Sequence, residues 1–516
     1  MHGLPLHGRT RHLQVPAARD AGEPLKPLRP ALLLLAAAIP TAASAQGYRV
    51  RLDSRVQAVS YRGVSLDSVP VSQVVTSPTG GLVSPDGFAV KCTAGAWCHF
   101  YRPGPELRGV PLSTTASLVL WGLGVPGLSA HAVGRLVNDA GSDDAWPTTE
   151  PTAQLLEGFL EYNRGALLAR GGRLLVMSRL EPIGFDGGWA RLRWAARHLE
   201  MTGYGGWGLG QAAVVPVASP ALNPLDEWRP RERQLVAGLE AAWSPGPADV
   251  RAEYRREIDP ETHEYVSERA AISATTRSWR SLRAKGGADW NLAEGHFGSA
   301  DLAVTWLGTR LTVTGGARRY RPYFSLWTLW GAFNPIPYNA VHGSVQATVT
   351  DWFTLRMRGE RFWFEDTEAS TPLVQVEDRG WRTSAGATLT PVPRLTVDAD
   401  WRAEFGPGAS SRSIDAMVSY APTDVLSFSL YGGTLDRPLE LRFYDAEATW
   451  IGGRAEWRPG DRWRAWGDAA WFDQTRNRPD PAASSLDQFC LRGGIAVTFG
   501  TSADRLPLPP ARPGRP

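Results

Sequence analysis

The chain has 516 residues, of which 43% are hydrophobic, and 55 Lys or Arg stand against 52 Asp or Glu. Outside one N-terminal stretch, no apolar run approaches the roughly 18–20 residues that a spanning helix needs, which excludes a helical membrane protein. The near balance of charge argues against nucleic acid as a partner, because nucleic-acid-binding proteins concentrate net positive charge.

The N-terminal stretch is "PLRPALLLLAAAIPTAASAQ". Lys26 and Arg29 precede a short apolar segment, and small residues follow it up to Ala45. This order predicts a secretory signal peptide with an N-terminal extension over residues 1–45, cleaved after Ala45. Removing the five basic and two acidic residues of that segment leaves 50 of each sign, so the mature chain is neutral.

Residues 63–113 contain two of the three cysteines, Cys92 and Cys98, in "FAVKCTAGAWCHFY". In an oxidising compartment this pair could close a small disulfide at a hairpin tip, or the two could remain separate thiols. A zinc site is disfavoured, because only His99 lies beside them and there is no second C-x-x-C pair. The segment itself is compatible with a plug, a surface lobe or an extra pair of strands.

The main part of the chain alternates apolar and polar residues over unusually long segments. "RLTVDADWRAEFG" (394–406) keeps this period of two for eleven residues, and residues 301–308, 309–320 and 353–360 behave in the same way. A period of two indicates β-strands, whose side chains point alternately to opposite faces. Short turn signals such as "PVPR", "APTD" and "RPGD" separate many of the segments, whereas others are joined by long polar stretches.

This pattern predicts an all-β fold over residues 46–500, a transmembrane antiparallel β-barrel in the bacterial outer membrane. A tilted strand needs about 9–11 residues to span hydrocarbon, and a closed barrel pairs every backbone amide. The count of segments predicts about 20 strands, within a range of 18–22. A soluble all-β fold is the alternative, but Trp306, Trp401 and Trp463 favour a lipid-facing wall.

The polar faces of these segments would line a water-filled lumen. They carry both signs of charge, and the candidate lumen or selectivity residues are Arg318, Arg356, Arg358, Glu360, Asp398, Asp400, Arg402 and Glu404. Opposed charges in a pore govern which solutes pass. The same residues could instead pair with one another and stiffen the wall.

The stretch "YRPYFSLWTLWGAFNPIPYN" (320–339) is rich in aromatic residues. Its candidate ligand contacts are Tyr320, Tyr323, Phe324, Trp327, Trp330, Phe333 and Tyr338. A loop this apolar must pack against something or bind something. Stacking against a solute and packing against neighbouring loops both remain open.

The segment "DQFCLRGGIAVTFG" closes the alternating region. It resembles the terminal assembly signal of outer-membrane β-barrel proteins, with Gly494, Val497 and Phe499 at the matching positions. The resemblance implies recognition by the barrel-insertion machinery. That signal usually ends the chain, whereas here a Pro-rich tail follows over residues 501–516, which we expect to be disordered.

A weaker resemblance concerns "RGGRLLVMSRLEPIGFDGGWARLRW" (170–194). It is similar to a stretch of porin-like barrels related to alginate-export channels. The resemblance favours transport and assigns no residue role.

The sequence predicts no catalytic residue, metal site or cofactor, because no His spacing fits a metal and no G-x-S-x-G motif is present. The predicted function is a porin-like channel for passive diffusion of small solutes, with outer-membrane lipid as its surroundings. The alternative is a plugged structural or binding barrel whose aromatic surface loops engage a partner. An outer-membrane hydrolase is the weakest candidate, and neither the solute nor the oligomeric state follows from the sequence.

Overall fold

The computed structural model describes residues 46–76, 81–92, 95–141, 152–209, 234–260, 263, 265–276, 281–321, 337–365, 379–406, 411–440, 444–476 and 486–501. All of them belong to one compact unit, Ala45–Pro516. The predicted signal peptide lies outside the described residues, as does the predicted tail beyond Thr501.

The described residues form 26 strands and two short 3₁₀ helices. Their bounds are β1 (Gly47–Pro70), η1 (Val71–Gln73), β2 (Val75–Thr76), β3 (Leu82–Val83), β4 (Lys91–Cys92), β5 (Trp97–Gly109), β6 (Pro111–Trp121), β7 (Leu128–Asp139), β8 (Ala153–Arg164), β9 (Leu167–Val176), β10 (Ile183–Trp194), η2 (Ala195–Arg197), β11 (Leu199–Gly208), β12 (Leu235–Trp243), β13 (Ala248–Ile258), β14 (Tyr265–Thr276), β15 (Leu282–Asn291), β16 (His296–Leu307), β17 (Leu311–Tyr320), β18 (Tyr338–Thr350), β19 (Phe353–Phe364), β20 (Arg379–Val392), β21 (Leu395–Phe405), β22 (Ser411–Tyr420), β23 (Leu426–Glu440), β24 (Tyr444–Gly460), β25 (Trp463–Arg476) and β26 (Leu486–Gly500). Among the described residues, no helix is long and apolar enough to cross a membrane.

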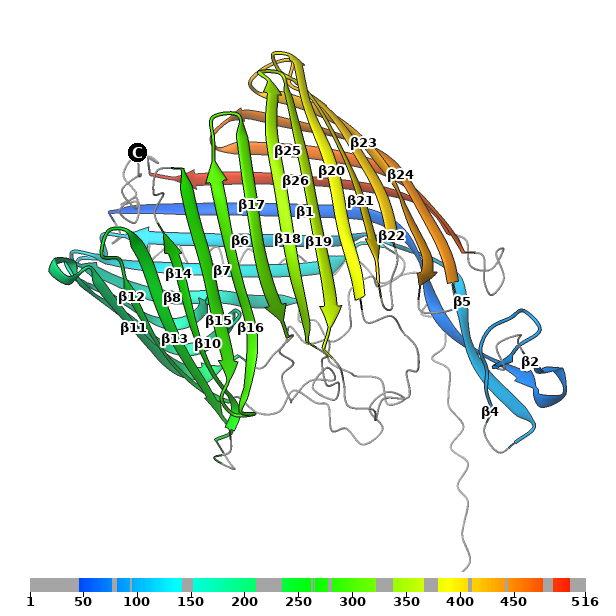
Figure 1. Ribbon diagram of the computed structural model, residues 1–516, viewed down its shortest axis with the longest axis horizontal. Coiled ribbons are helices and arrows are strands. Elements are labelled where there is room, and N and C mark those ends of the chain that lie inside the picture. Colours follow the sequence, from blue (N-terminus) through cyan, green and yellow to red (C-terminus); the bar gives the residue numbers. More distant parts are fainter. Residues whose placement is uncertain are drawn as a thin grey trace, which may run out of the picture. The chain divides into compact units, whose positions relative to one another are not determined.

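The strands close into a barrel (Figure 1). Each strand from β6 to β26 pairs antiparallel with the next, and β1 pairs with both β6 and β26. The ring therefore has 22 strands, β1 together with β6 to β26. The predicted barrel and the predicted range of 18–22 are confirmed, and the preferred count of 20 was two strands short.

The outer face of the barrel carries a broad apolar band. Alternate residues of each strand point away from the lumen, and most of those in the middle of the wall are apolar. Trp306, Trp401 and Trp463 all lie on this face and are exposed, as the sequence predicts. Exposed aromatic side chains gather near the two ends of the wall. At one end they are Tyr48, Trp194, Trp243, Trp306, Trp352, Tyr420, Trp457, Trp463 and Phe499, and at the other Trp207, Tyr265, Trp363, Trp381, Trp471 and Phe489. Two aromatic girdles around an apolar band are typical of a barrel that spans a bilayer.

The two ends of the barrel differ in their connections. At the end where β1 begins and β26 ends, short turns join the strands, such as residues 351–352, 393–394 and 461–462. At the opposite end the connections are longer, and the widest spans residues 209–234 between β11 and β12. This asymmetry matches outer-membrane barrels, in which the short turns face the periplasm.

At the long-loop end, β1 continues beyond the barrel and pairs with β5 as a two-stranded ribbon (Figure 1). The ribbon carries β4, which pairs with β5 at Cys92 and Cys98, and these two residues form a disulfide. Val69, Phe88, Cys98 and Phe100 form a small buried cluster beneath it. The segment that holds both cysteines is thus an ordered extension of a barrel strand.

Candidate functional site: the inner wall

The predicted lumen residues lie on one face of the wall. Asp398, Asp400, Arg402 and Glu404 alternate with outward-facing residues along β21, so their side chains share a side. Directly opposite residues in an antiparallel pair point the same way, and Glu404 faces Arg382 on β20, which in turn faces Glu360 on β19. The opposite face carries Trp401 and other exposed apolar residues, so the charged face lines the lumen.

Glu360 is the centre of a charge ladder across β17 to β21. One of its oxygens, Oε1, is 2.6 Å from Arg318 Nη2 and 2.9 Å from Arg382 Nη1, and Arg358 Nη2 lies 3.6 Å from Oε2. Arg382 also reaches Glu404 Oε1 at 2.9 Å. The Glu360 side chain is only 2% exposed, and charge-assisted hydrogen bonds of this kind compensate for burying a carboxylate.

A second cluster lies nearer the short-turn end. Arg356 Nη2 is 3.0 Å from Asp398 Oδ2 and 3.1 Å from Asp400 Oδ2. The hydroxyl of Thr388 donates to Asp398 and accepts from Arg356. One guanidinium therefore bridges two carboxylates that are adjacent on the same face of β21, and the three groups together carry one net negative charge.

The lumen along these strands is open to solvent. The Arg358 side chain points inward and is 57% exposed to solvent. The side chains of Arg356, Arg382 and Glu404 are about one-third exposed. Arg402 lies between Ser384 and Ser413 in the strand register, where no acid faces it directly. The predicted set is thus a series of inward-facing ion pairs in contact with water, in which Arg402 is the member with no acid directly opposite it.

Aromatic side chains cover the long-loop end of the ladder. The guanidinium carbon of Arg382 lies 4.4 Å from the ring centre of Phe362 and 5.6 Å from that of Tyr338. Arg318 lies 5.5 Å from the same Tyr338 ring, and Tyr320 packs against Tyr338 with 5.4 Å between ring centres. Tyr320 and Tyr338 flank the predicted aromatic loop; its other candidates, Tyr323, Phe324, Trp327, Trp330 and Phe333, lie outside the described residues.

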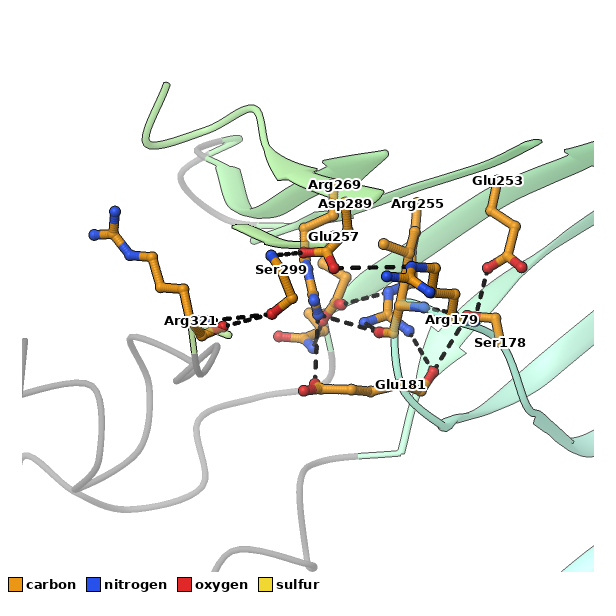
Figure 2. Close-up of polar contacts among 12 residues, drawn as sticks. Ser178, Arg179, Glu181, Glu253, Arg255, Glu257, Arg269, Asp289, Ser299 and Arg321 are labelled. Atoms are coloured by element: carbon orange, nitrogen blue, oxygen red, sulfur yellow. Dashed lines mark hydrogen bonds and ion pairs between the residues drawn. The ribbon is translucent and has the colours of Figure 1, made fainter. Parts of the chain in front are cut away.

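Sequence reasoning missed the most buried polar cluster of the inner wall. It forms where the β9–β10 loop, residues 177–182, folds against β13 to β16 (Figure 2). Arg255 donates to the carbonyl oxygens of Leu180 and Glu181, and Arg269 donates to the Leu180 carbonyl at 3.1 Å. Leu180 is 1% exposed and Arg255 is 3% exposed, so the loop covers this part of the wall.

Arg179 fastens the same loop farther around the barrel. Its Nη2 is 2.6 Å from Asp301 Oδ1 on β16, and its backbone N–H donates to Glu253 on β13 at 2.9 Å. Glu181 has a positive φ of 76°, a conformation that a non-glycine residue adopts only when its surroundings hold it. The hydrogen bond from Arg255 to its carbonyl and the Arg269 ion pair to its side chain, at 3.4 Å, supply that support.

Part of this cluster had a signal in the sequence. Arg251, Glu253, Arg255 and Glu257 alternate along β13, which marks an inward-facing charged strand as clearly as β21. The residues of the β9–β10 loop that contact this cluster gave no such signal in the sequence. Six residues between two strands do not reveal whether they fold over the lumen or away from it.

A third group joins aromatic rings and cations on β7 to β10. His131 stacks on Phe159 with 4.8 Å between ring centres, and Arg170 lies 5.2 Å from Phe159 and 5.0 Å from Trp189. Glu161 holds Arg170 through an oxygen 2.8 Å from Nε. The lumen therefore offers flat, partly cationic surfaces on two separate sectors of the wall.

The residues of the predicted assembly signal lie on β26. Val497 and Phe499 point outward, whereas Gly494 points inward beneath Trp466. A Cβ atom added at Gly494 would lie 2.6 Å from Trp466 Nε1, so the indole itself requires glycine here. Within the described part of the chain, no group of three or more His, Cys, Asp or Glu is placed to hold a metal ion.

No protein-family model matches the chain, and no curated protein matches it. Among solved structures it is similar to the translocation pore of the P pilus usher PapC, with a TM-score of 0.44 and 9% identity over 88% of this chain and 99% of that one. It is also similar to OccAB4 of Acinetobacter baumannii, with a TM-score of 0.39 and 8% identity over 89% and 99% of the two chains. A BenF-like porin from Pseudomonas fluorescens Pf-5 gives a TM-score of 0.37 and 9% identity over 88% and 99%. At these scores the likenesses assign no function.

Proposed function

We propose that this chain is a porin-like channel of the bacterial outer membrane, through which small solutes diffuse passively. The observation that carries the proposal is the exposure of inward-facing charges such as Arg358, which requires water inside the closed ring. Support for the location comes from the apolar outer wall, its two aromatic girdles and the contrast between short turns and long loops. The signal peptide that the sequence predicts over residues 1–45 would direct export and agrees with this location.

The charge pattern favours weak selectivity for the sign of an ion. Arginines and carboxylates alternate around the wall, and most of them lie within one hydrogen bond of an opposite charge. A solute therefore meets transverse pairs rather than a ring of one sign. Flat solutes would gain contact with the aromatic–arginine surfaces around Trp189 and Phe362.

Conductance in planar bilayers tests the proposal. The purified, folded full-length protein should give discrete current steps in potassium chloride, proportional to salt concentration as for a water-filled pore. Liposomes that contain it should release small neutral sugars at rates that fall with sugar size. A folded protein that gives no current and no release would overturn the channel.

A plugged binding barrel is the second candidate, and the β9–β10 loop favours it. This loop buries the inner face of β13 to β15, and Arg255, Arg269 and Glu257 beneath it are nearly inaccessible. A plugged barrel predicts no conductance in the whole protein, and a steady conductance after the loop is shortened. A channel instead predicts current before any change to the loop.

A further inference from the structure

The outer wall of β19 to β22 has an apolar band with a sharp upper limit. Along β22 the outward-facing residues are Tyr420, Val418, Ala416 and Ile414, and the next one is Arg412. Along β19 the outward residues are apolar from Phe353 to Gly359 and then reach Arg361. The outward residues of β20 carry no charge from Leu389 to Trp381, and Arg379 follows.

The height of this limit matches a lipid boundary. Leu389 and Trp381 lie eight residue steps apart on β20. At about 3.3 Å per residue and a tilt near 40°, these steps rise about 20 Å along the membrane normal. The apolar band of outer-membrane barrels is about 25 Å tall. The three arginines therefore begin where the hydrocarbon of the long-loop leaflet ends.

These arginines lie beside a pair of aromatic rings that pack with their planes tilted by 34°. Trp381 and Phe405 lie 4.6 Å apart between ring centres, Arg361 faces Trp381 across the strand register, and Arg412 lies 5.5 Å from the Phe405 ring. Arg379 faces Trp363 on the neighbouring strand in the same way. We call Arg361, Arg379 and Arg412, with Trp381 and Phe405, the rim patch.

Two of the three arginines are available to a ligand. Arg361 and Arg412 are exposed, and neither forms an ion pair with a described residue. The acid that faces Arg412 in the register is Asp436. By contrast, outward-facing Arg173 at the same end is held by both oxygens of Asp186, at 2.8 and 3.0 Å.

We propose that the rim patch binds the phosphate groups of a phosphorylated lipid in the outer leaflet. Guanidinium groups bind phosphate through paired hydrogen bonds, and aromatic rings favour the headgroup boundary at which such phosphates lie. The patch is on the lipid-facing side, where a soluble anion would have to pass the headgroups to reach it. The inference rests on the proposed outer-membrane location and is independent of solute passage through the lumen.

The site is confined to one sector, because the rim changes sign beyond β22. The outward residues at the long-loop end of β23 to β26 include Asp436, Glu447, Asp473 and Asp487, which face one another in two pairs across the strand register. These acids would repel a phosphate unless a cation intervened. Direct binding is therefore expected at β19 to β22 in the absence of divalent cations.

The test compares two pairs of substitutions in the folded full-length protein in detergent micelles without divalent cations. The probe is bisphosphorylated lipid A, titrated and followed by native mass spectrometry. Arg361→Gln with Arg412→Gln should weaken binding about 25-fold, since each basic residue near an anionic lipid surface contributes about fivefold. The matched control, Arg358→Gln with Arg402→Gln, changes two inward-facing residues of β19 and β21 and should bind the lipid as the unmodified protein does.

A further pair of variants and a second lipid test whether weaker binding comes from the lost charges, from misfolding or from a general change in lipid affinity. Arg361→Lys with Arg412→Lys should retain binding within about fivefold, which excludes misfolding as the cause of the loss. Lipid A without phosphates should bind all variants equally and weakly. The proposal is overturned if the Gln pair binds as the unmodified protein does, if the inward pair loses as much, or if removing the phosphates leaves the affinity unchanged. Bilayer conductance of the Arg361/Arg412 variant should stay unchanged, so a failure here leaves the channel proposal standing.

Discussion

Arg382 on β20 faces Glu360 on β19, with 2.9 Å between Nη1 and Oε1. The same guanidinium reaches Glu404 on β21, so one side chain joins three neighbouring strands. Arg318 extends the ladder to β17 through Glu360. The ladder runs around the circumference of the barrel, parallel to the backbone hydrogen bonds, and reinforces the wall at that height.

Glu360→Gln should destabilise this ladder. The substitution removes a buried negative charge and leaves Arg318, Arg358 and Arg382 close together without it. Because the arginines are partly exposed, we expect a loss of about 2 kcal/mol in the free energy of unfolding, below the 3–5 kcal/mol typical of fully buried pairs. Denaturant unfolding followed by tryptophan fluorescence measures it. Glu404→Gln, at a more exposed position, should cost less than about 1 kcal/mol.

Arg358→Gln should shift ion selectivity towards cations. The side chain points into the lumen and is mostly exposed. An ion that passes about 8 Å from it through water meets about 0.5 kcal/mol of interaction, unfavourable for a cation and favourable for an anion. Removing both effects changes the ratio of cation to anion permeability by about fivefold. The reversal potential across a salt gradient reports this ratio. Arg361→Gln, three positions along the same strand but on the outer wall, should leave it unchanged, and equal shifts in both variants would contradict the assignment of the inner face.

Arg179→Gln should loosen the β9–β10 loop. The change removes the ion pairs of the Arg179 side chain to Asp301, at 2.6 Å, and to Asp289, at 4.0 Å, and leaves its backbone hydrogen bond to Glu253. A loop released from β13 to β16 can move in the lumen, so single-channel recordings should show more frequent brief closures. Arg193→Gln, at an inward-facing position outside the loop, is the control. Recordings as quiet as those of the unmodified protein would show that the remaining bonds from Arg255 and Arg269 suffice.

Replacing both Cys92 and Cys98 by Ser should act locally. The disulfide lies in the ribbon of β1 and β5, outside the ring of 22 strands. Limited proteolysis should therefore cut faster within residues 71–97, while the barrel keeps its resistance to denaturant. A large drop in barrel stability would mean that the ribbon supports the wall.

Phe499→Ala tests the assembly signal. The ring points outward from β26 and is about half exposed, so its loss removes little packing. We expect slower insertion when the barrel-insertion machinery is supplied, with nearly unchanged refolding in detergent. Ile495→Ala, an outward residue of the same strand outside the predicted signal, is the control. If both changes slow insertion equally, the effect comes from the loss of an apolar side chain and not from recognition of the assembly signal.

The sequence predicted the architecture because alternation along a strand reports its surroundings directly. Asp398 and Asp400 were assigned to the lumen from their own strand alone, and the structure places them there beside Arg356. Their partner could not be predicted, because the register between strands depends on shear and turn length. The preferred strand count was low by two because amphipathic strands give weak individual signals.

The contribution of loops was beyond sequence reasoning. Leu180 looks like an ordinary turn residue. Its carbonyl oxygen nevertheless accepts hydrogen bonds from two buried arginines, on strands about 80 residues away in the chain. Tyr338 was proposed as a loop contact, and it lies at the start of β18 against the charge ladder. Such contacts depend on how the ring closes, and no local pattern encodes that.

The ring closes between its first and last members, since β1 pairs with β26 over ten residue positions. A nascent polypeptide that lacks its final strand has two open edges and cannot seal, however much of it has been translated. Closure of the wall therefore has to wait until β26 has been synthesised. The start of β1 also meets the end of β26, because the Tyr48 N–H donates to Thr501 Oγ1 at 3.1 Å. A chain cut at another short turn and ligated at this point would form the same cylinder.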